Sequence, residues 1–105
     1  ELLNANLKSD QGKIHKDPYP EQGLFYRSDN ATLARLGVPA HSFSSTQLDK
    51  DKHYHQTTDD LASLDLDSMH KVIESLASST HGLVDGSVTP TRVDISKVNA
   101  KGLIY

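Results

Sequence analysis

The strongest pattern along the chain is an apolar stripe at helical spacing between residues 66 and 77. Charged and hydroxyl side chains fill the positions between its members, which are Leu66, Met69, Val72, Ile73, Leu76 and Ala77. Spacing of three and four residues places side chains on one face of an α-helix. The pattern predicts a helix over residues 67–81 that is begun by Asp65 or Asp67, ended by Gly82, and packed into the core through the stripe.

Weaker patterns predict the elements before this helix. Residues 1–16 begin with a partial helical stripe of leucines. A short helix is expected after the Ser, Asp and Asn at positions 28–30, which are good N-cap residues, and it stops at Gly37. Residues 38–44 then predict a strand.

A strand between helices indicates an α/β domain. One strand cannot form a sheet, and even two strands are marginal in water. The expected fold is therefore the C-terminal part of a larger three-layer α/β/α sandwich, to which residues 1–84 belong. Residues 85–105 are expected to be a C-terminal extension, either a tail or one edge strand. Because the chain begins with Glu1 and not Met, we expect it to be a piece of a longer protein.

The composition excludes several classes of function. Apolar residues make up 35% of the chain, which is enough for a modest core only. The net charge of −3 and the dispersed Lys and Arg residues argue against a nucleic-acid surface. No apolar run approaches the ~18 residues of a membrane span. The absence of cysteine excludes disulfides and thiolate metal sites.

Candidate chemistry concentrates at residues 53–60, which read His-Tyr-His-Gln-Thr-Thr-Asp-Asp. A neutral imidazole is a common zinc ligand, and a nearby carboxylate can orient such a ring. Because this run leads into the predicted helix, we expect a loop held by a rigid element. From the residue types alone, both a metal site and a solvated loop fit the pattern.

Two motifs make the chain resemble the C-terminal part of the zinc-dependent aminopeptidases of metallopeptidase family 28. The first covers residues 26–40, which begin Tyr-Arg-Ser-Asp-Asn and end Leu-Gly-Val-Pro-Ala. It is similar to the family's Ser-Asp-His run, short helix and Gly-Ile/Val-Pro-Ala, although Asn30 stands where the family more often has His. The second covers residues 53–61 and is similar to the family's aromatic-His pattern, which is followed by an Asp.

The resemblance implies a zinc-exopeptidase sandwich of the phosphorylase/hydrolase-like type and a zinc ligand at His55. His53 aligns one step earlier, where no ligand is expected. In the family, the other ligands and the general-base Glu come from earlier loops, so this chain is expected to hold no catalytic residue and to be inert alone. Its partners would be the upstream part of the same domain and a peptide substrate with a free amino terminus. The intact parent would bind two zinc ions and be periplasmic or extracellular.

The same resemblance suggests roles for three polar side chains. Ser28 and Asp29 are expected near the metal, and N-capping of the short helix is the compatible alternative. Asp59 is a candidate for holding the His55 ring or for bracing its loop. Its alternative is a turn residue bonded to its own backbone.

Three aromatic side chains flank the motifs. Phe25, Tyr26 and Tyr54 are candidates for the wall of a pocket that receives the first side chain of a substrate. Interior packing is the alternative interpretation for all three.

Three other functions stay open at this point. A glutaminyl cyclase-like enzyme is the first, although members of that branch tend to carry Trp at the position of Tyr54. The second is an interaction domain that keeps the peptidase fold without its metal. The third is a small binding module that folds by itself.

Overall fold

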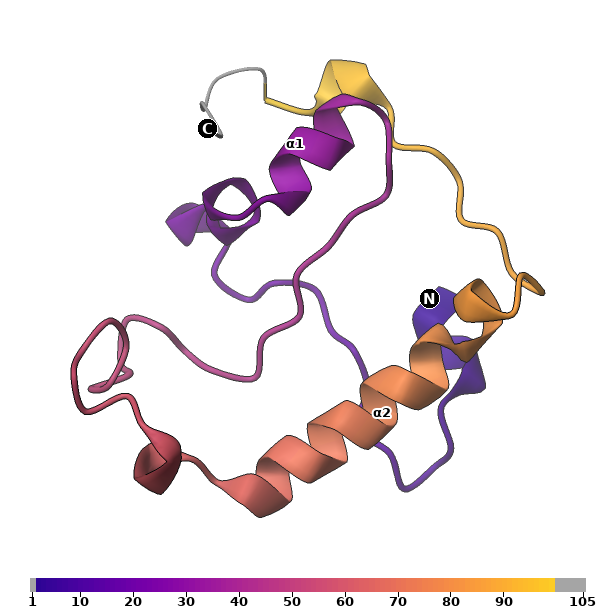
Figure 1. Cartoon of the computed structure of the whole chain (residues 1–105). Coiled ribbons are helices and arrows are strands. Elements are labelled where there is room, and N and C mark those ends of the chain that lie inside the picture. The colour runs from indigo at the N-terminus through magenta and orange to yellow at the C-terminus, as the bar shows by residue number, and fades with distance from the viewer. Residues whose placement is uncertain (1, 100–105) are drawn as a thin grey trace. The chain divides into compact units, whose positions relative to one another are not determined.

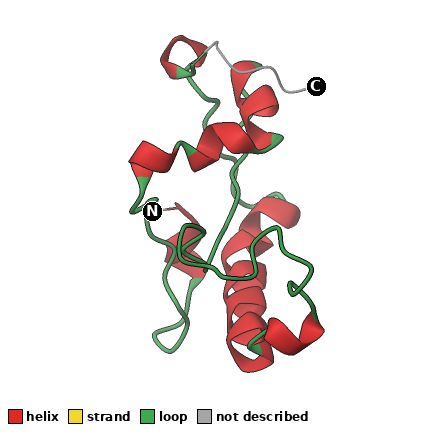
Figure 2. Cartoon of the chain, turned by 90° about the vertical axis from the view of Figure 1, so that its left-hand side faces the viewer, coloured by secondary structure: helices red, strands yellow, loops and turns green. Residues whose placement is uncertain are grey.

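The computed structural model describes residues 2–99, which fold into helices joined by long loops (Figure 1, Figure 2). Within residues 2–99 there are two α-helices, α1 (Asn30–Arg35) and α2 (Leu66–Val84). The remaining elements are short 3-10 helices, namely η1 (Leu2–Asn6), η2 (Pro20–Gln22), η3 (Leu24–Arg27), η4 (Leu61–Ser63) and η5 (Ile95–Lys97).

The expected α/β/α sandwich is wrong for this chain, since the described residues contain no strand and no sheet. Residues 38–44, predicted as a strand, form an irregular segment. Isolated apolar residues beside a proline favour extended backbone, but a strand exists only where a second strand accepts and donates its ladder of hydrogen bonds. None of the other described segments supplies that ladder.

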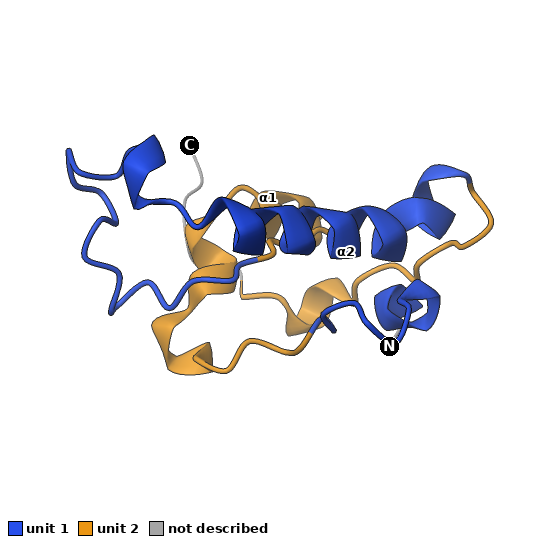
Figure 3. Cartoon of the chain, turned by 90° about the horizontal axis from the view of Figure 1, so that it is seen from below, with its two compact units in different colours: residues 1–14, 44–85 blue, residues 15–43, 86–105 orange. Residues whose placement is uncertain are grey.

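The chain divides into two compact units, coloured separately in Figure 3. In the described residues, unit 1 consists of 2–14 and 44–85, and unit 2 consists of 15–43 and 86–99. The motif at 53–61 therefore lies in unit 1 and the motif at 26–40 in unit 2.

In unit 1, α2 packs against η1 through its small residues and not through its apolar stripe. Ser75, Ser79 and Gly82 are buried, and the amide of Gln11 donates a hydrogen bond of 2.9 Å to the hydroxyl of Ser78 on the same side. Small side chains allow close approach of a neighbouring segment. The contact thus forms along the small-residue face.

The prediction that the apolar stripe packs into the core is wrong within the described residues. Leu66, Met69 and Ile73 are exposed to 56%, 48% and 53%. Helical periodicity identifies the apolar face of a helix, but burial of that face needs an apolar partner of similar extent. In the described part of unit 1, these stripe residues are left without such a partner.

The helix α2 is also longer than predicted. Its start is as expected, because the Asp65 carboxylate accepts hydrogen bonds from the backbone N–H and the hydroxyl of Ser68, at 3.0 and 2.8 Å. The bond from the backbone N–H has the larger effect on the carboxyl and the bond from the hydroxyl the smaller. Together they hold the pKa of the Asp65 carboxyl below its usual range. Gly82 does not end the helix, which continues to Val84.

Among the described residues, no helix has the length and apolarity that crossing a membrane requires.

In unit 2, α1 supplies the small core. Ala31 and Ala34 are fully buried, and the helix contacts η3. The chain leaves α1 through Gly37, whose φ of 79° lies in the left-handed region. Such a residue after a helix is normally glycine, because a Cβ is disfavoured there.

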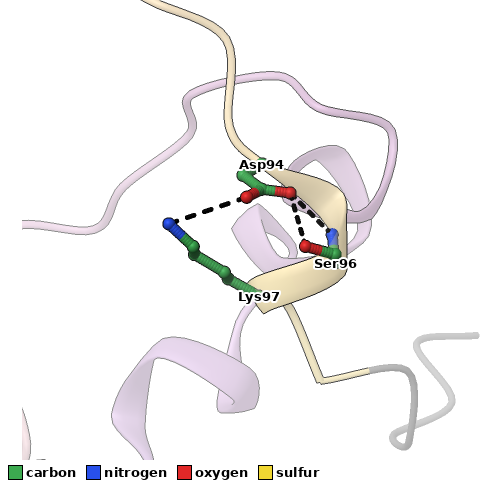
Figure 4. A network of polar contacts seen from close by, with 3 residues as sticks. All are labelled: Asp94, Ser96 and Lys97. Atoms are coloured by element: carbon green, nitrogen blue, oxygen red, sulfur yellow. Dashed lines mark hydrogen bonds and ion pairs between the residues drawn. The ribbon is translucent and has the colours of Figure 1, made fainter.

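Residues 92–99 lie along the end of α1 as irregular chain and one turn of 3-10 helix. The N–H of Val93 donates to the carbonyl of Gly37 at 3.0 Å, and this isolated bond starts no strand. The turn η5 is capped by Asp94, whose carboxylate accepts bonds from the hydroxyl and N–H of Ser96 and pairs with Lys97 at 3.6 Å (Figure 4). Of the expected extension, residues 100–105 lie outside the described residues.

Candidate metal-ligand loop

The loop at 51–60 is built by short-range hydrogen bonds. The Asp51 carboxylate accepts from the N–H of His53 at 2.9 Å, and the Asp60 carboxylate accepts from the N–H of Ala62, also at 2.9 Å. Two consecutive turns lie between them. The first joins Gln56 N–H to the His53 carbonyl at 2.9 Å, and the second joins Asp59 N–H to the Gln56 carbonyl at 3.1 Å. Polar side chains thus fix a segment without regular structure.

His55 adopts an unusual backbone conformation in the first of these turns. Its φ is 57°, and it is the one non-glycine residue among residues 2–99 with a positive φ. It occupies the third position of the turn from His53 to Gln56. A positive φ at that position is normally supplied by Gly or Asn, because a larger side chain meets its own backbone there. Such conformations cluster at functional sites.

The Tyr54 ring stacks on the imidazole of His55. The two ring centroids are 4.0 Å apart and the ring planes are inclined by 19°. Tyr54 is half-buried and His55 is exposed. Within the described residues, the two nitrogens of His55 make no hydrogen bond, so both are accessible in the plane of the ring.

The two histidines of the loop differ in their surroundings. His53 is half-buried, and its Nδ1 lies 3.0 Å from the hydroxyl of Thr58, so one of its two nitrogens is already engaged. The Asp59 carboxylate makes no hydrogen bond to His55 in the described part of the chain, and only its backbone takes part in the turn. Among the described residues, the His55 ring therefore stacks on Tyr54 and has no hydrogen bond to Asp59.

In unit 2, Asn30 organises the first motif. It is 7% exposed, its amide nitrogen donates to the Phe25 carbonyl at 3.0 Å, and its amide oxygen accepts from the Ser42 hydroxyl at 3.1 Å. The Ser42 hydroxyl also lies 3.4 Å from that of Ser28. Asp29 occupies the N-cap position of α1, but no side-chain hydrogen bond caps the helix. The side chains of Ser28 and Asp29 thus do not cap α1 in this structure.

The aromatic candidates of unit 2 contact one another. Phe25 and Tyr26 meet edge to face, with ring centroids 5.1 Å apart, and Phe25 also lies 6.0 Å from the ring of His41. The Tyr26 hydroxyl accepts a hydrogen bond from the N–H of Asn99 at 3.0 Å. Sequence reasoning missed His41, Ser42 and Asn99. Only the position of the first two, directly after the Val-Pro-Ala of the first motif, could have pointed to them.

The described residues do not form a complete metal site. Residues 2–99 bring together no group of three or more His, Asp or Glu side chains that could hold a metal ion. A hydrolytic zinc site needs about three protein ligands and an open position. The exposed imidazole of His55, with two accessible nitrogens, fits one ligand of such a site.

Comparison with known proteins places the chain among the peptidases, a class of hydrolases. The model of peptidase family M28 matches residues 1–80, which is well over half of the chain, and the chain belongs to this family. Peptidases of this family are generally metal-dependent. No curated protein and no solved structure matches the chain. Membership indicates a peptidase function and a peptide substrate.

Proposed function

We propose that this chain is the C-terminal segment of a zinc-dependent aminopeptidase and contributes one zinc ligand, His55. The other ligands would come from residues of the same peptidase outside this chain, which we call the parent peptidase. Membership of peptidase family M28 supports the peptidase class. The lack of a three-ligand group in residues 2–99 supports a shared site.

The observation that carries the proposal is the state of the His55 side chain. Its backbone is held in a left-handed turn, its ring is backed by Tyr54, and its two nitrogens are accessible within the described residues. A ligand needs a lone pair that no protein group occupies. His53 meets this condition less well, because its Nδ1 is engaged by Thr58.

When bound in such a site, zinc lowers the pKa of its water so that hydroxide exists near neutral pH. The residues of this chain would hold and shape the site without exchanging protons with the substrate. His55 would bind through a ring nitrogen in its neutral form. On the family resemblance, Phe25 and Tyr26, both half-buried and in mutual contact within unit 2, are candidates for contact with the first side chain of the substrate.

An assay of the parent peptidase with aminoacyl substrates tests this function. Wild type is expected to release the leaving group from substrates with a free amino terminus and not from the same substrates with an acetylated one. His55→Ala is expected to lose activity by more than about 100-fold, since a lost ligand costs more than the 10–100-fold of a supporting residue. His70→Gln, on the exposed face of α2, serves as control. Full activity of His55→Ala would contradict the proposal, as would cleavage of the acetylated substrates.

The localisation is proposed on the resemblance to secreted aminopeptidases. A periplasmic or extracellular parent peptidase would meet peptides with free amino termini. Fractionation of cells that express the parent peptidase tests this, and recovery in the cytosolic fraction alone would contradict it.

A further inference from the structure

The contact between Tyr54 and His55 has a geometry that suits a ligand ring. A metal binds an imidazole in the plane of the ring, along the lone pair of a nitrogen. The phenol ring of Tyr54 covers the face of the imidazole instead, at a centroid distance of 4.0 Å and an inclination of 19°. The stack therefore restricts rotation of the imidazole about its last side-chain bond and leaves both nitrogens accessible.

Among residues 2–99, no hydrogen bond or ion pair restrains the His55 ring. Imidazoles that bind metals usually donate their second N–H to a carboxylate or carbonyl, which fixes the ring. In the described residues no such acceptor reaches His55, and the Asp59 carboxylate makes no bond to it. Tyr54 is half-buried and His55 is exposed, and their rings contact each other by stacking.

The backbone brings the two rings together. The turn from His53 to Gln56, with its 2.9 Å hydrogen bond, places Tyr54 and His55 at its two central positions. The φ of 57° at His55 turns its side chain away from the direction that an extended chain would give it. The strained conformation and the stack are thus parts of one arrangement.

We propose that Tyr54 is a positioning residue for metal binding, which sets the plane of the His55 imidazole by stacking. This inference rests on the proposed function, in which His55 is a zinc ligand. Stacked aromatic pairs contribute enough to change an equilibrium about two- to tenfold. A ring that has lost electron density to a bound cation also stacks more strongly on an electron-rich phenol, so ligation and stacking support each other.

The test measures zinc affinity of the parent peptidase by competition with a chelating indicator. Tyr54→Leu is expected to weaken zinc binding about two- to tenfold, while Tyr54→Phe, which keeps the ring, stays within about twofold of wild type. Tyr19→Leu, which removes a half-buried tyrosine of unit 2, is the matched control and leaves the affinity unchanged. Equal affinities of Tyr54→Leu and wild type would overturn the inference.

A second measurement does not depend on zinc or on the folding of the Leu variant. In the metal-free protein, the carbon-bound ring protons of His55 lie over the Tyr54 ring and should resonate upfield of those of the exposed His70. Resonances of His55 that coincide with those of His70 would overturn the inference.

The His55→Ala variant separates the two proposals. If it loses zinc while Tyr54→Leu binds zinc like wild type, only the positioning role fails. If it keeps the zinc affinity of wild type, His55 is no ligand, and the proposed function fails together with the inference that depends on it.

Discussion

The guanidinium of Arg92 donates a hydrogen bond of 2.6 Å from Nη2 to the carbonyl oxygen of Leu36, at the C-terminal end of α1. The last carbonyls of a helix lack partners within the helix and carry partial negative charge, so a cation is favoured there. Together with the bond from Val93 to Gly37, this contact holds residues 92–99 against the first motif. The C-terminal segment thus supports α1 within unit 2.

Replacement of Arg92 tests this support. Arg92→Met keeps the length and apolar stem of the side chain and removes the charged donor. We expect the free energy of unfolding to fall by about 1 kcal/mol, the usual net contribution of one such hydrogen bond. Arg27→Met is the matched control, because the side chain of the exposed Arg27 makes no hydrogen bond or ion pair in the described residues. It should change stability by less than about 0.5 kcal/mol. Equal stabilities of the two variants, measured by denaturant unfolding, would contradict the role of Arg92.

Gly37 is expected to tolerate no side chain. Its φ is 79°, and a Cβ at this position would lie 3.1 Å from Arg92 Nη2 and 3.4 Å from the Val93 carbonyl oxygen. Gly37→Ala should therefore destabilise the protein by about 1–2 kcal/mol. At Gly12 a Cβ would meet only the Ser75 hydroxyl, at 3.9 Å, and φ is not positive. Gly12→Ala should be neutral or slightly stabilising in the same unfolding measurement. The reverse order of the two variants would contradict the structure.

Because φ of His55 is positive, two substitutions at this residue should differ in their effect on stability but not in their effect on metal binding. Asn tolerates the left-handed region better than other residues with a Cβ, while Ala does not. We expect the free energy of unfolding of His55→Asn to be about 1 kcal/mol higher than that of His55→Ala. Both variants should lose zinc equally, since neither has an imidazole. A comparison of denaturation curves for the two metal-free variants tests the conformation independently of the metal, and identical curves would argue against it.

The N-cap of α2 predicts a pH dependence at the acid end. The pKa of Asp65 is lowered in the folded state by the bonds from Ser68, so the unfolded chain takes up this proton first as the pH falls. The stabilisation is complete above the ordinary Asp value of about 4 and is lost as the pH falls through the lower folded pKa. Helical circular dichroism should show this loss in wild type. Asp65→Asn should reduce the slope, and an unchanged profile would contradict the cap.

The sequence was a good guide to the helices and a poor guide to what they pack against. The apolar stripe from Leu66 to Ala77 predicted α2, and Asp65, one of the two expected cap residues, is its N-cap. The same stripe predicted a buried face, yet the buried face carries Ser75, Ser79 and Gly82. Periodicity is a local property of the chain, whereas burial depends on a partner surface. The predicted sheet failed for the same reason, because pairing requires a second strand.

The candidate site also combines a residue that the sequence predicted with contacts that only the structure shows. The motif at 53–61 pointed to His55, and the family match is consistent with that motif as a peptidase feature. Composition could not show that His53 is engaged by Thr58, that Tyr54 stacks on His55, or that φ of His55 is positive. These facts depend on the turn geometry. Asn30 was one of three candidates for the N-cap of the short helix, but its amide instead joins η3 to Ser42.

Zinc affinity of the parent peptidase, compared between wild type, His55→Ala and His53→Ala, tests the central claim most directly. If His55 is the ligand, His55→Ala should weaken zinc binding by more than about 100-fold, while His53→Ala stays within about tenfold of wild type because it disturbs only the loop. Zinc binding of His55→Ala that equals wild type, or a larger loss in His53→Ala than in His55→Ala, would contradict the assignment.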